Sequence, residues 1–366
     1  MAPKIYDLSE ANGILKFTLN GTDVSIANGL RRTAISDIDT VVCRTTPYEK
    51  NDCEFEINTS RFNHEILKQR LSCIPIHITD IEGFPYEQYV LECHVKNDTD
   101  AILYVTTRDF RIKNKLTEEF IPDEQKEQIF PKNDFTNEYI KFCRLRPSIS
   151  EEIHGEEIKF SCKFSVGNCK ENSMFNVSSI CAYGNTPDVI KVNETWDAVE
   201  EKYKNDNLSK DEIAFNKANW LAIDAKRIYQ DNSYDFKVKS IGVFSNKYLM
   251  TTACKIIIQK ITTLKEKISE LSILPAELVN QNGFDVCLYQ EGYTIGKILE
   301  SVLYSRFFEK EKKITYVGFK KNHPHDDYCF VRVVLPNNDG IDELRIILQK
   351  CFDDIMTIYS EIKEQF

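Results

Sequence analysis

The sequence lacks the features that mark a disordered or membrane-spanning chain. It holds only 13 glycines and 11 prolines among 366 residues, too few for extensive disorder. No unbroken apolar run approaches the ~20 residues that a spanning helix needs. The first residues, MAPKIYDLSE, do not have the charged and then apolar pattern of a secretory signal. We therefore expect a folded, soluble, intracellular protein with two or more domains, since single domains usually run to ~100–200 residues.

The sequence also has no CxxC motif, although it holds twelve cysteines. Structural zinc requires two Cys or His pairs with short spacing. His323 and His325 form the nearest candidate pair, but no second pair accompanies them, so an ordinary loop is the better interpretation. The cysteines are spread along the chain, and no two are closer than Cys162 and Cys169. We expect free buried thiols, with no metal and no cofactor.

Charge and motifs exclude two further classes of function. The net charge of −10 repels phosphate backbones and argues against a primary nucleic-acid binder. A local basic patch leaves proximity to DNA open; it comprises Lys310, Lys312, Lys313, Lys320 and Lys321. No GxSxG, P-loop, HExxH or DxDxD motif is found, so we predict no catalytic residue and no enzyme activity in this chain alone.

The start of the chain predicts a strand followed by an amphipathic helix. Residues 13–19 alternate apolar and polar side chains, and Asp23 offers a helix N-cap after a turn. Ile26, Leu30 and Ala34 then recur every fourth residue, which is the spacing of one helix face. Arg31 and Arg32 fall on other faces of this helix.

The middle of the chain, residues 47–234, has the alternating pattern of short strands and predicts a mostly β domain. Two polar stretches interrupt it, at residues 117–137 and 193–211, and we interpret the second as partly helical. A strand at 234–243 follows, and Ser245 then caps a long amphipathic helix.

After Pro275 the same order begins again. Residues 285–288 predict a strand, 294–308 a helix, 314–319 and 329–335 two strands, and the residues after Gly340 a final long helix. The chain therefore predicts an α+β fold in which strand, helix, strands and long helix occur twice, once interrupted by the β domain. Two apolar helical surfaces in one chain favour packing of the two halves against each other as a pseudo-symmetric pair.

Several segments resemble the alpha family of RNA polymerase subunits. The Asn-x-Leu-Arg-Arg hallmark of the family's first helix is present as Asn28, Leu30, Arg31 and Arg32. An Arg-Leu-x-x-Ile-Pro block begins at Arg70, and residues 172–183 and 234–268 follow later blocks of the same family.

The C-terminal part resembles the small alpha-like partner, equivalent to the eleventh subunit of eukaryotic RNA polymerase II. Residues 292–303, GYTIGKILESVL, are similar to its first helix, and residues 314–324 are similar to its strand that ends in His-Pro. Tyr293 departs from the family, which usually has His there. The clustered cysteines by which some relatives bind zinc or an iron–sulfur cluster are missing. A chain that joins equivalents of the third and eleventh subunits resembles those of large nucleocytoplasmic DNA viruses.

The resemblance implies a non-catalytic assembly subunit of a multisubunit DNA-directed RNA polymerase. Residues 1–46 and 235–270 would form the first dimerisation domain, 47–234 an inserted domain, 271–283 a linker, and 284–366 the second, smaller dimerisation domain. The implied partners are two large catalytic subunits and a small subunit of the same assembly, with DNA contacted only through the complex and no membrane. The implied place of action is a viral factory in the host cytoplasm, the virion or the host nucleus.

The resemblance also implies two groups of site residues. The interface with the large subunits would comprise Asn28, Arg31, Arg32 and Arg70. The intramolecular dimer seam would comprise Ile26, Leu30, Ala34, Leu249, Ile257, Ile261, Leu264, Ile298, Leu299, Val302, Leu344, Leu348 and Ile355.

The residues by themselves leave alternatives open. Arg31 and Arg32 also fit the solvated face of a helix, and Arg70 also fits a packing role at the entry to a strand. Tyr359 and Phe366 fit either a core or a partner anchor. An alpha-like scaffold of a different assembly would show the same apolar helices, and only its partners would distinguish it.

Overall fold

The computed structural model describes residues 2–150, 152–276, 282–336 and 340–366. The chain forms two compact units. Unit 1 comprises Met1–Ala34, Ile180–Lys239 and Met250–Phe366, and unit 2 comprises Ile35–Ser179 and Ser240–Leu249. Within the described ranges, no helix is both long and apolar enough to cross a membrane. The predicted α+β content is confirmed by the strands and helices of both units.

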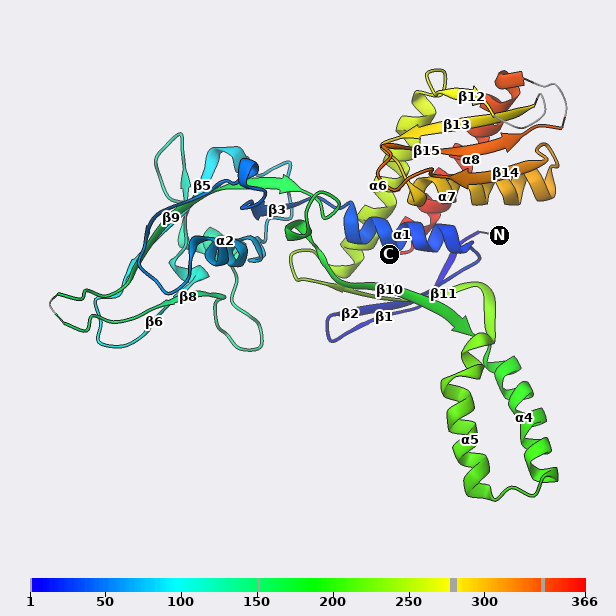
Figure 1. Ribbon diagram of the computed structural model, residues 1–366, viewed down its shortest axis with the longest axis horizontal. Helices are drawn as coiled ribbons and strands as arrows, with labels where there is room; N and C mark the ends of the chain where they lie inside the picture. Colours follow the sequence, from blue (N-terminus) through cyan, green and yellow to red (C-terminus); the bar gives the residue numbers. More distant parts are fainter. Residues whose placement is uncertain (1, 151, 277–281, 337–339) are drawn as a thin grey trace. The chain divides into compact units, whose positions relative to one another are not determined.

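Unit 1 contains two four-stranded sheets with the same strand order (Figure 1). In the first sheet the order is β1, β2, β11, β10, with bounds Lys4–Ala11, Ile14–Asn20, Tyr229–Ser240 and Ser178–Pro187. In the second it is β12, β13, β15, β14, with bounds Ile273–Pro275, Gly283–Tyr289, Tyr328–Val334 and Tyr316–Lys320. If the four strands of each sheet are numbered as they occur along the chain, both sheets have the spatial order first, second, fourth, third.

The helices of unit 1 also follow the repeat expected from the sequence. In each sheet, one helix follows the second strand along the chain and a longer helix follows the fourth. For the first sheet these are α1 (Val24–Ser36) and α6 (Asn246–Glu266), and for the second they are α7 (Tyr293–Val302) and α8 (Gly340–Lys363). Strand β2 shows why the elements pack. Its alternate side chains Leu15, Phe17 and Leu19 are buried, while Lys16 between them is exposed.

The helix predicted for residues 294–308 is only partly α-helical. The α-helix α7 ends at Val302, and Leu303–Lys310 continue as a π-helical segment, η6. A π-helix is rare, and its wider turn shifts the side chains that follow relative to α-helical spacing. Arg306 on η6 donates from Nη1 to the Asp354 carboxylate of α8 at 2.7 and 2.6 Å.

Unit 2 is mostly β, with a five-stranded and a two-stranded sheet. The first has the order β3, β9, β5, β7, with β4 also pairing with β9; the bounds are Thr40–Cys43, Glu157–Gly167, Tyr89–Lys96, Arg111–Asn114 and Cys53–Asn58. The second joins β6 (Leu103–Thr106) to β8 (Lys141–Leu145), and two helices, α2 (His64–Ser72) and α3 (Asp123–Ile129), accompany the sheets. Phe110, Phe142 and Phe160 pack edge-on or tilted at the centre of the core.

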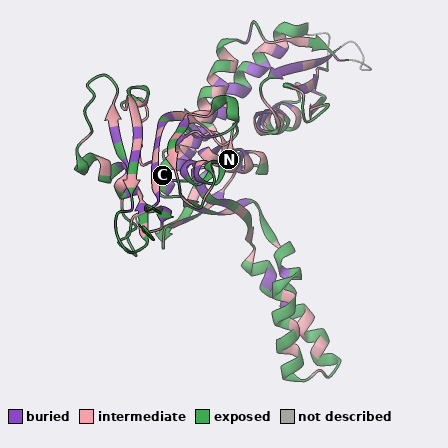
Figure 2. Ribbon diagram, turned by 60° about the vertical axis from the view of Figure 1, so that its left-hand side comes forward, coloured by how far each residue is buried: buried purple, intermediate pink, exposed green. Residues whose placement is uncertain are grey.

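The boundaries of the compact units differ from the expected inserted domain of residues 47–234. Unit 2 begins at Ile35, and its first segment ends at Ser179, because β10 joins β11 in a sheet of unit 1. Between these two strands, α4 (Val189–Asn205) and α5 (Lys210–Ala222) form a helical hairpin that extends from the end of the sheet (Figure 1). The polar stretch at 193–211 comprises most of α4, the turn after it and the first residues of α5, and the hairpin is largely exposed (Figure 2).

All twelve cysteines are free, and ten of them are buried. Burial raises the pKa of Cys254 to about 12, so this thiol stays protonated and unreactive near neutral pH. Cys73 is exposed and Cys169 is half-buried. We expect a thiol reagent to label Cys73 first under native conditions, Cys169 more slowly, and the others only after denaturation. Peptide mass spectrometry checks this order, and native labelling of Cys254 as fast as that of Cys73 would contradict it.

Candidate functional site

Helix α1 carries the residues that the sequence marks most strongly. Its first turn is capped by Asp23, whose Oδ1 accepts a hydrogen bond from the backbone N–H of Ser25 at 2.8 Å. The predicted apolar stripe is buried, with Ile26 3% exposed and Leu30 and Ala34 0% exposed. Burial of this face fixes the rotation of the helix, so that Arg32 lies on the exposed side.

Gly29 allows α1 to approach α7 and α8 closely. A Cβ atom built on Gly29 would lie 2.6 Å from Cδ1 of Ile298 and 2.7 Å from Oη of Tyr359. The Tyr359 hydroxyl, which is fully buried, donates a hydrogen bond to the backbone carbonyl of Ile26 at 3.0 Å. A side chain at position 29 would therefore separate the helices. Sequence alone shows only a poor helix former near the start of a helix.

The contact between α1 and α7 joins equivalent positions of the two halves. Counted from the first residues of these helices, Val24 and Tyr293, Gly29 and Ile298 are both the sixth residue. These two residues are the ones that meet. In an isologous interface both partners use the same surface patch, so equivalent positions near the symmetry axis face each other.

The long helices meet in the same way. Counted from Asn246 and Gly340, Thr262 on α6 and Met356 on α8 are both the seventeenth residue. The hydroxyl of Thr262 lies 3.3 Å from the sulfur of Met356. Two pairs of positions that match when counted from the helix starts are therefore in contact within unit 1.

The residues expected in the dimer seam are almost all buried. Those that are at most 6% exposed are Ile26, Leu30, Ala34, Leu249, Ile257, Ile261, Ile298, Leu299, Val302, Leu344, Leu348 and Ile355. Leu264 departs from the expectation, since it is only half-buried near the end of α6. Leu249 falls in unit 2, whereas the other residues belong to unit 1.

The two arginines of α1 have different surroundings. Arg31 is half-buried, and its Nε donates to Oδ1 of Asn28 at 3.0 Å. Arg32 is exposed, and its Nε donates to the hydroxyl of Thr294 on α7 at 3.0 Å. Both guanidinium groups also carry terminal N–H donors suited to bidentate contacts with carboxylates.

The equivalent positions of α7 carry no arginine. Counted in the same way from the helix starts, Arg31 and Arg32 correspond to Glu300 and Ser301. Glu300 forms an ion pair with Lys297 on its own helix. The matching positions of the two helices thus differ in charge, since α1 carries two arginines where α7 carries an ion-paired glutamate and a serine.

Arg70 belongs to unit 2, whereas Asn28, Arg31 and Arg32 belong to unit 1. Its Nε donates to the carbonyl of Phe142 at 2.7 Å, and its Nη2 donates to that of Lys141 at 2.9 Å. The guanidinium group also lies over the ring of Phe62. These contacts join α2 to β8, which is the packing alternative that the sequence left open.

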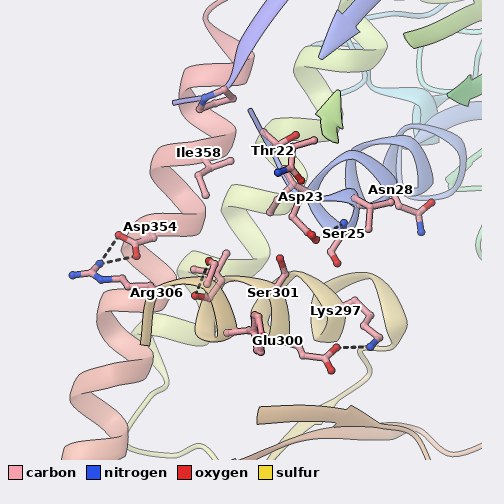
Figure 3. A pocket seen from close by; sticks show the side chains of 18 of the residues that line it. Thr22, Asp23, Ser25, Asn28, Lys297, Glu300, Ser301, Arg306, Asp354 and Ile358 are labelled. Atoms are coloured by element: carbon pink, nitrogen blue, oxygen red, sulfur yellow. Dashed lines mark hydrogen bonds and ion pairs between the residues drawn. The ribbon is translucent and has the colours of Figure 1, made fainter. Parts of the chain in front are cut away.

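A groove with a volume of about 1430 Å³ lies beside α1 in unit 1 (Figure 3). The start of α1, helix α7, segment η6 and helix α8 supply its walls. Figure 3 shows the Arg306–Asp354 pair at one wall and Lys297 with Glu300 at another. Sequence reasoning missed this groove and the Arg306–Asp354 pair, because 48 residues separate the partners and no local pattern relates them.

Tyr359 and Phe366, which the sequence left open, both pack against other residues of unit 1. Tyr359 is a core residue, and Phe366 packs edge-on against Phe17 with ring centroids 4.9 Å apart. His323 and His325 lie in an exposed turn. Among the residues that the structure describes, no group of three or more His, Cys, Asp or Glu side chains is arranged to hold a metal ion.

Several known proteins are similar to this chain in sequence. Among similar proteins is a conjugation stage-specific protein of Tetrahymena thermophila, 23% identical over 304 residues that cover 70% of this chain and 92% of that protein. DNA-directed RNA polymerase subunit Rpo3 of Methanosphaera stadtmanae is 22% identical over 69% of this chain and 94% of its own length. DNA-directed RNA polymerase II subunit rpb3 of Dictyostelium discoideum is 24% identical over 55% of this chain and 65% of its own.

The match to a family covers more than half of the chain and includes α1, β10, β11 and most of α6. Residues 16–261 match the RNA polymerase Rpb3/Rpb11 dimerisation domain. The buried helix faces and the close contact at Gly29 lie within or against this span. The chain belongs to the family of the RNA polymerase Rpb3/Rpb11 dimerisation domain.

Proposed function

We propose that this protein is a non-catalytic assembly subunit of a multisubunit DNA-directed RNA polymerase. In this proposal the two halves of unit 1 are the equivalents of the third and eleventh subunits, fused in one chain and paired intramolecularly. The pair is the platform for two large catalytic subunits, with a small subunit of the same assembly also bound. Two relatives named as polymerase subunits, one archaeal and one from a slime mould, support this assignment.

The contact of equivalent positions is the observation that carries the proposal. Gly29 meets Ile298, and Thr262 meets Met356, as expected for an isologous interface between two similar units. The identical strand order of the two sheets supports the same interpretation. A domain named for dimerisation then has its partner in the same polypeptide.

Fusion changes how such a platform assembles. Joining two binding partners by a short linker gives an effective concentration of roughly millimolar, so pairing does not depend on the supply of a separate subunit. Part of the predicted linker, residues 277–281, lies outside the described residues. The viral source and the place of action expected from the sequence resemblance are further parts of this proposal.

The charge difference between α1 and α7 supports binding of two different large subunits. A pair of identical halves would present the same surface twice. Here one half presents Arg31 and Arg32, and the other presents Glu300 and Ser301 at the matching positions. A large subunit with acidic groups at its docking surface would be attracted to the α1 side, whereas the equivalent α7 position offers it no arginine.

Affinity purification of the tagged full-length chain from its native source, followed by mass spectrometry, tests the proposal. We expect two large polymerase subunits to remain bound to the wild type. The Arg31→Ala/Arg32→Ala variant should lose at least about 2 kcal/mol of binding free energy, roughly 30-fold in affinity, because guanidinium groups in buried interfaces are often dominant contacts.

A matched control removes two positive charges elsewhere in unit 1. Lys202→Ala/Lys255→Ala changes exposed lysines on α4 and α6 and should leave the bound subunits unchanged. Recovery of the wild type alone, or with chains unrelated to polymerase, would favour the alternative of an alpha-like scaffold in another assembly. Equal binding by wild type and the arginine variant would remove α1 from the interface but leave the platform intact.

A further inference from the structure

We propose that the groove beside α1 binds a protein segment of a large polymerase subunit that carries a lysine or arginine side chain. This inference rests on the proposed function and adds the chemistry of the segment that docks. The groove has a volume of about 1430 Å³, above the ~300–1,000 Å³ typical of small-molecule sites. A stretch of polypeptide fits a groove of this size.

The lining of the groove has an excess of negative charge. Six carboxylates line it, on Asp23, Glu300, Glu309, Glu311, Asp354 and Glu361. Four cationic side chains line it, on Arg32, Lys297, Arg306 and Lys310. The difference, six minus four, leaves a net charge of −2, which attracts a cationic segment and repels nucleic-acid phosphates.

Ion pairs within the walls use half of the carboxylates. Lys297 pairs with Glu300, and Arg306 pairs with both Asp354 and Glu311. No ion pair within the described parts of the chain involves the other three, which belong to Asp23, Glu309 and Glu361. These three carboxylates are therefore available to a partner.

Asp23 is already held in position by its capping role. Its Oδ1 accepts from the N–H of Ser25, and its Oδ2 accepts no hydrogen bond within the described residues. A carboxylate fixed through one oxygen loses little side-chain freedom when the other oxygen binds a cation. The side chain is exposed at the groove, as Figure 3 shows.

Thr22 supplies a second, independent indication that the groove takes a ligand. Its side chain lines the groove and is 6% exposed, and its Oγ1 is buried with no hydrogen-bond partner. A buried hydroxyl without a partner is unfavourable, and a hydrogen bond from a bound segment would remove this cost. A small rotation of this side chain toward a docked segment would supply the missing hydrogen bond.

The arginines of α1 and the carboxylates of the groove together determine in which orientation a segment docks. Arg31 and Arg32 favour acidic groups of the partner, and the free carboxylates of the groove favour basic ones. Opposite requirements at neighbouring sites fix the register and orientation of a bound segment more strongly than one charged patch does. A segment docked in reverse would place like charges together.

Crosslinking in the assembled polymerase tests where the segment lies. A photoreactive amino acid at Ile358, an uncharged residue that lines the groove, is introduced into the full-length chain, and the crosslinked peptide is sequenced by mass spectrometry. We expect a peptide of a large subunit with a lysine or arginine next to the crosslink. A crosslink to nucleic acid, to a small molecule or to a segment without a basic residue overturns the inference, as does no crosslink in an assembled complex.

Charge substitution tests the recognition itself. Asp23→Asn/Glu361→Gln keeps the cap and the side-chain shapes, since asparagine is also a good N-cap. We expect about 10-fold weaker binding of the large subunits and a weaker dependence on salt, as for loss of desolvated charge pairs. The control Asp197→Asn/Glu201→Gln makes the same charge change on the exposed hairpin helix α4 and should have no effect.

The outcomes separate this inference from the proposed function. If the large subunits bind wild type and Asp23→Asn/Glu361→Gln equally, the platform stands and the basic-segment inference fails. If wild type binds no large subunit, both fail. Restoration of binding to Asp23→Lys/Glu361→Lys by an acidic substitution at the crosslinked basic residue would support the contact directly.

Discussion

Replacement of Gly29 by leucine is expected to lower the free energy of unfolding by about 3 kcal/mol, the upper part of the range for overpacked cores. A Cβ atom at this position would already lie 2.6 Å from Ile298 and 2.7 Å from Tyr359. The leucine side chain adds three more carbons where α1 meets α7 and α8. Denaturant titration of wild type and variant measures the loss.

Gly29→Ala provides a finer test of the same contact. Alanine gains up to ~1 kcal/mol of helix propensity over glycine, so the measured change is the steric cost less this gain. The second substitution Ile298→Val removes the Cδ1 atom that lies closest. We expect Gly29→Ala/Ile298→Val to have a free energy of unfolding at least about 0.5 kcal/mol higher than the value obtained by adding the effects of the two single substitutions.

Gly184 provides a matched control for Gly29. A Cβ atom there meets nothing within 4 Å, so Gly184→Ala should change stability by less than about 0.5 kcal/mol. If Gly29→Ala instead stabilised the protein by the full gain in helix propensity, α1 would not approach α7 as closely as described, and the pairing of the two halves would lose its main support.

Substitution of Tyr359 by alanine is expected to cost about 3–5 kcal/mol, as for other large aromatic side chains in cores. Tyr359 is fully buried, and its hydroxyl joins α8 to the backbone of Ile26, 333 residues earlier in the chain. Tyr359→Phe keeps the ring and removes only this hydrogen bond, so it should cost about 1 kcal/mol. The difference between the two variants separates the contribution of packing from that of the hydroxyl.

Burial of Tyr359 also predicts how stability depends on alkaline pH. Desolvation raises the pKa of this hydroxyl well above its ordinary value of 10, so the folded state retains a proton that the unfolded state releases. Its contribution to stability is therefore complete below pH 10 and is lost as pH rises above it. One such group contributes a slope of up to about 1.4 kcal/mol per pH unit.

The measurement is the unfolding free energy between pH 10 and 11 for wild type and Tyr359→Phe. The phenylalanine variant should be less stable at pH 9 but lose stability less steeply above pH 10. Tyr234, whose pKa burial raises to about 12, contributes to the slope in both proteins and cancels in the comparison. Equal slopes would mean that the Tyr359 hydroxyl ionises freely and is not held in the core.

Much of the helix and strand pattern was predictable because it depends on neighbours in the sequence. The cap at Asp23, the buried stripe from Ile26 to Ala34 and the alternation in β2 all reflect local spacing. The limit of this reasoning is visible at residue 303. There α7 continues as a π-helix, which the apolar spacing of three and four does not distinguish from an α-helix.

The contacts of the residues predicted for the interface could be foreseen from the sequence only in part. Family resemblance marked Asn28, Arg31, Arg32 and Arg70 together, yet Arg70 donates to two carbonyls of β8 in unit 2. Its motif is local, whereas its role depends on a strand 71 residues away. The groove of unit 1 was not predicted at all, because its carboxylates come from the cap of α1, from α7, from η6 and the residue after it, and from α8.

The amino-acid sequence by itself determined the identity of most elements, the repeated order of strands and helices, and the faces that would be buried. These depend on periodicity and capping, which act over a few residues. Tertiary structure decided which sheet β10 joins, that positions 29 and 298 touch, and which carboxylates remain unpaired in the groove. Such contacts join residues tens to hundreds of positions apart, and only packing of the whole chain brings them within reach of each other.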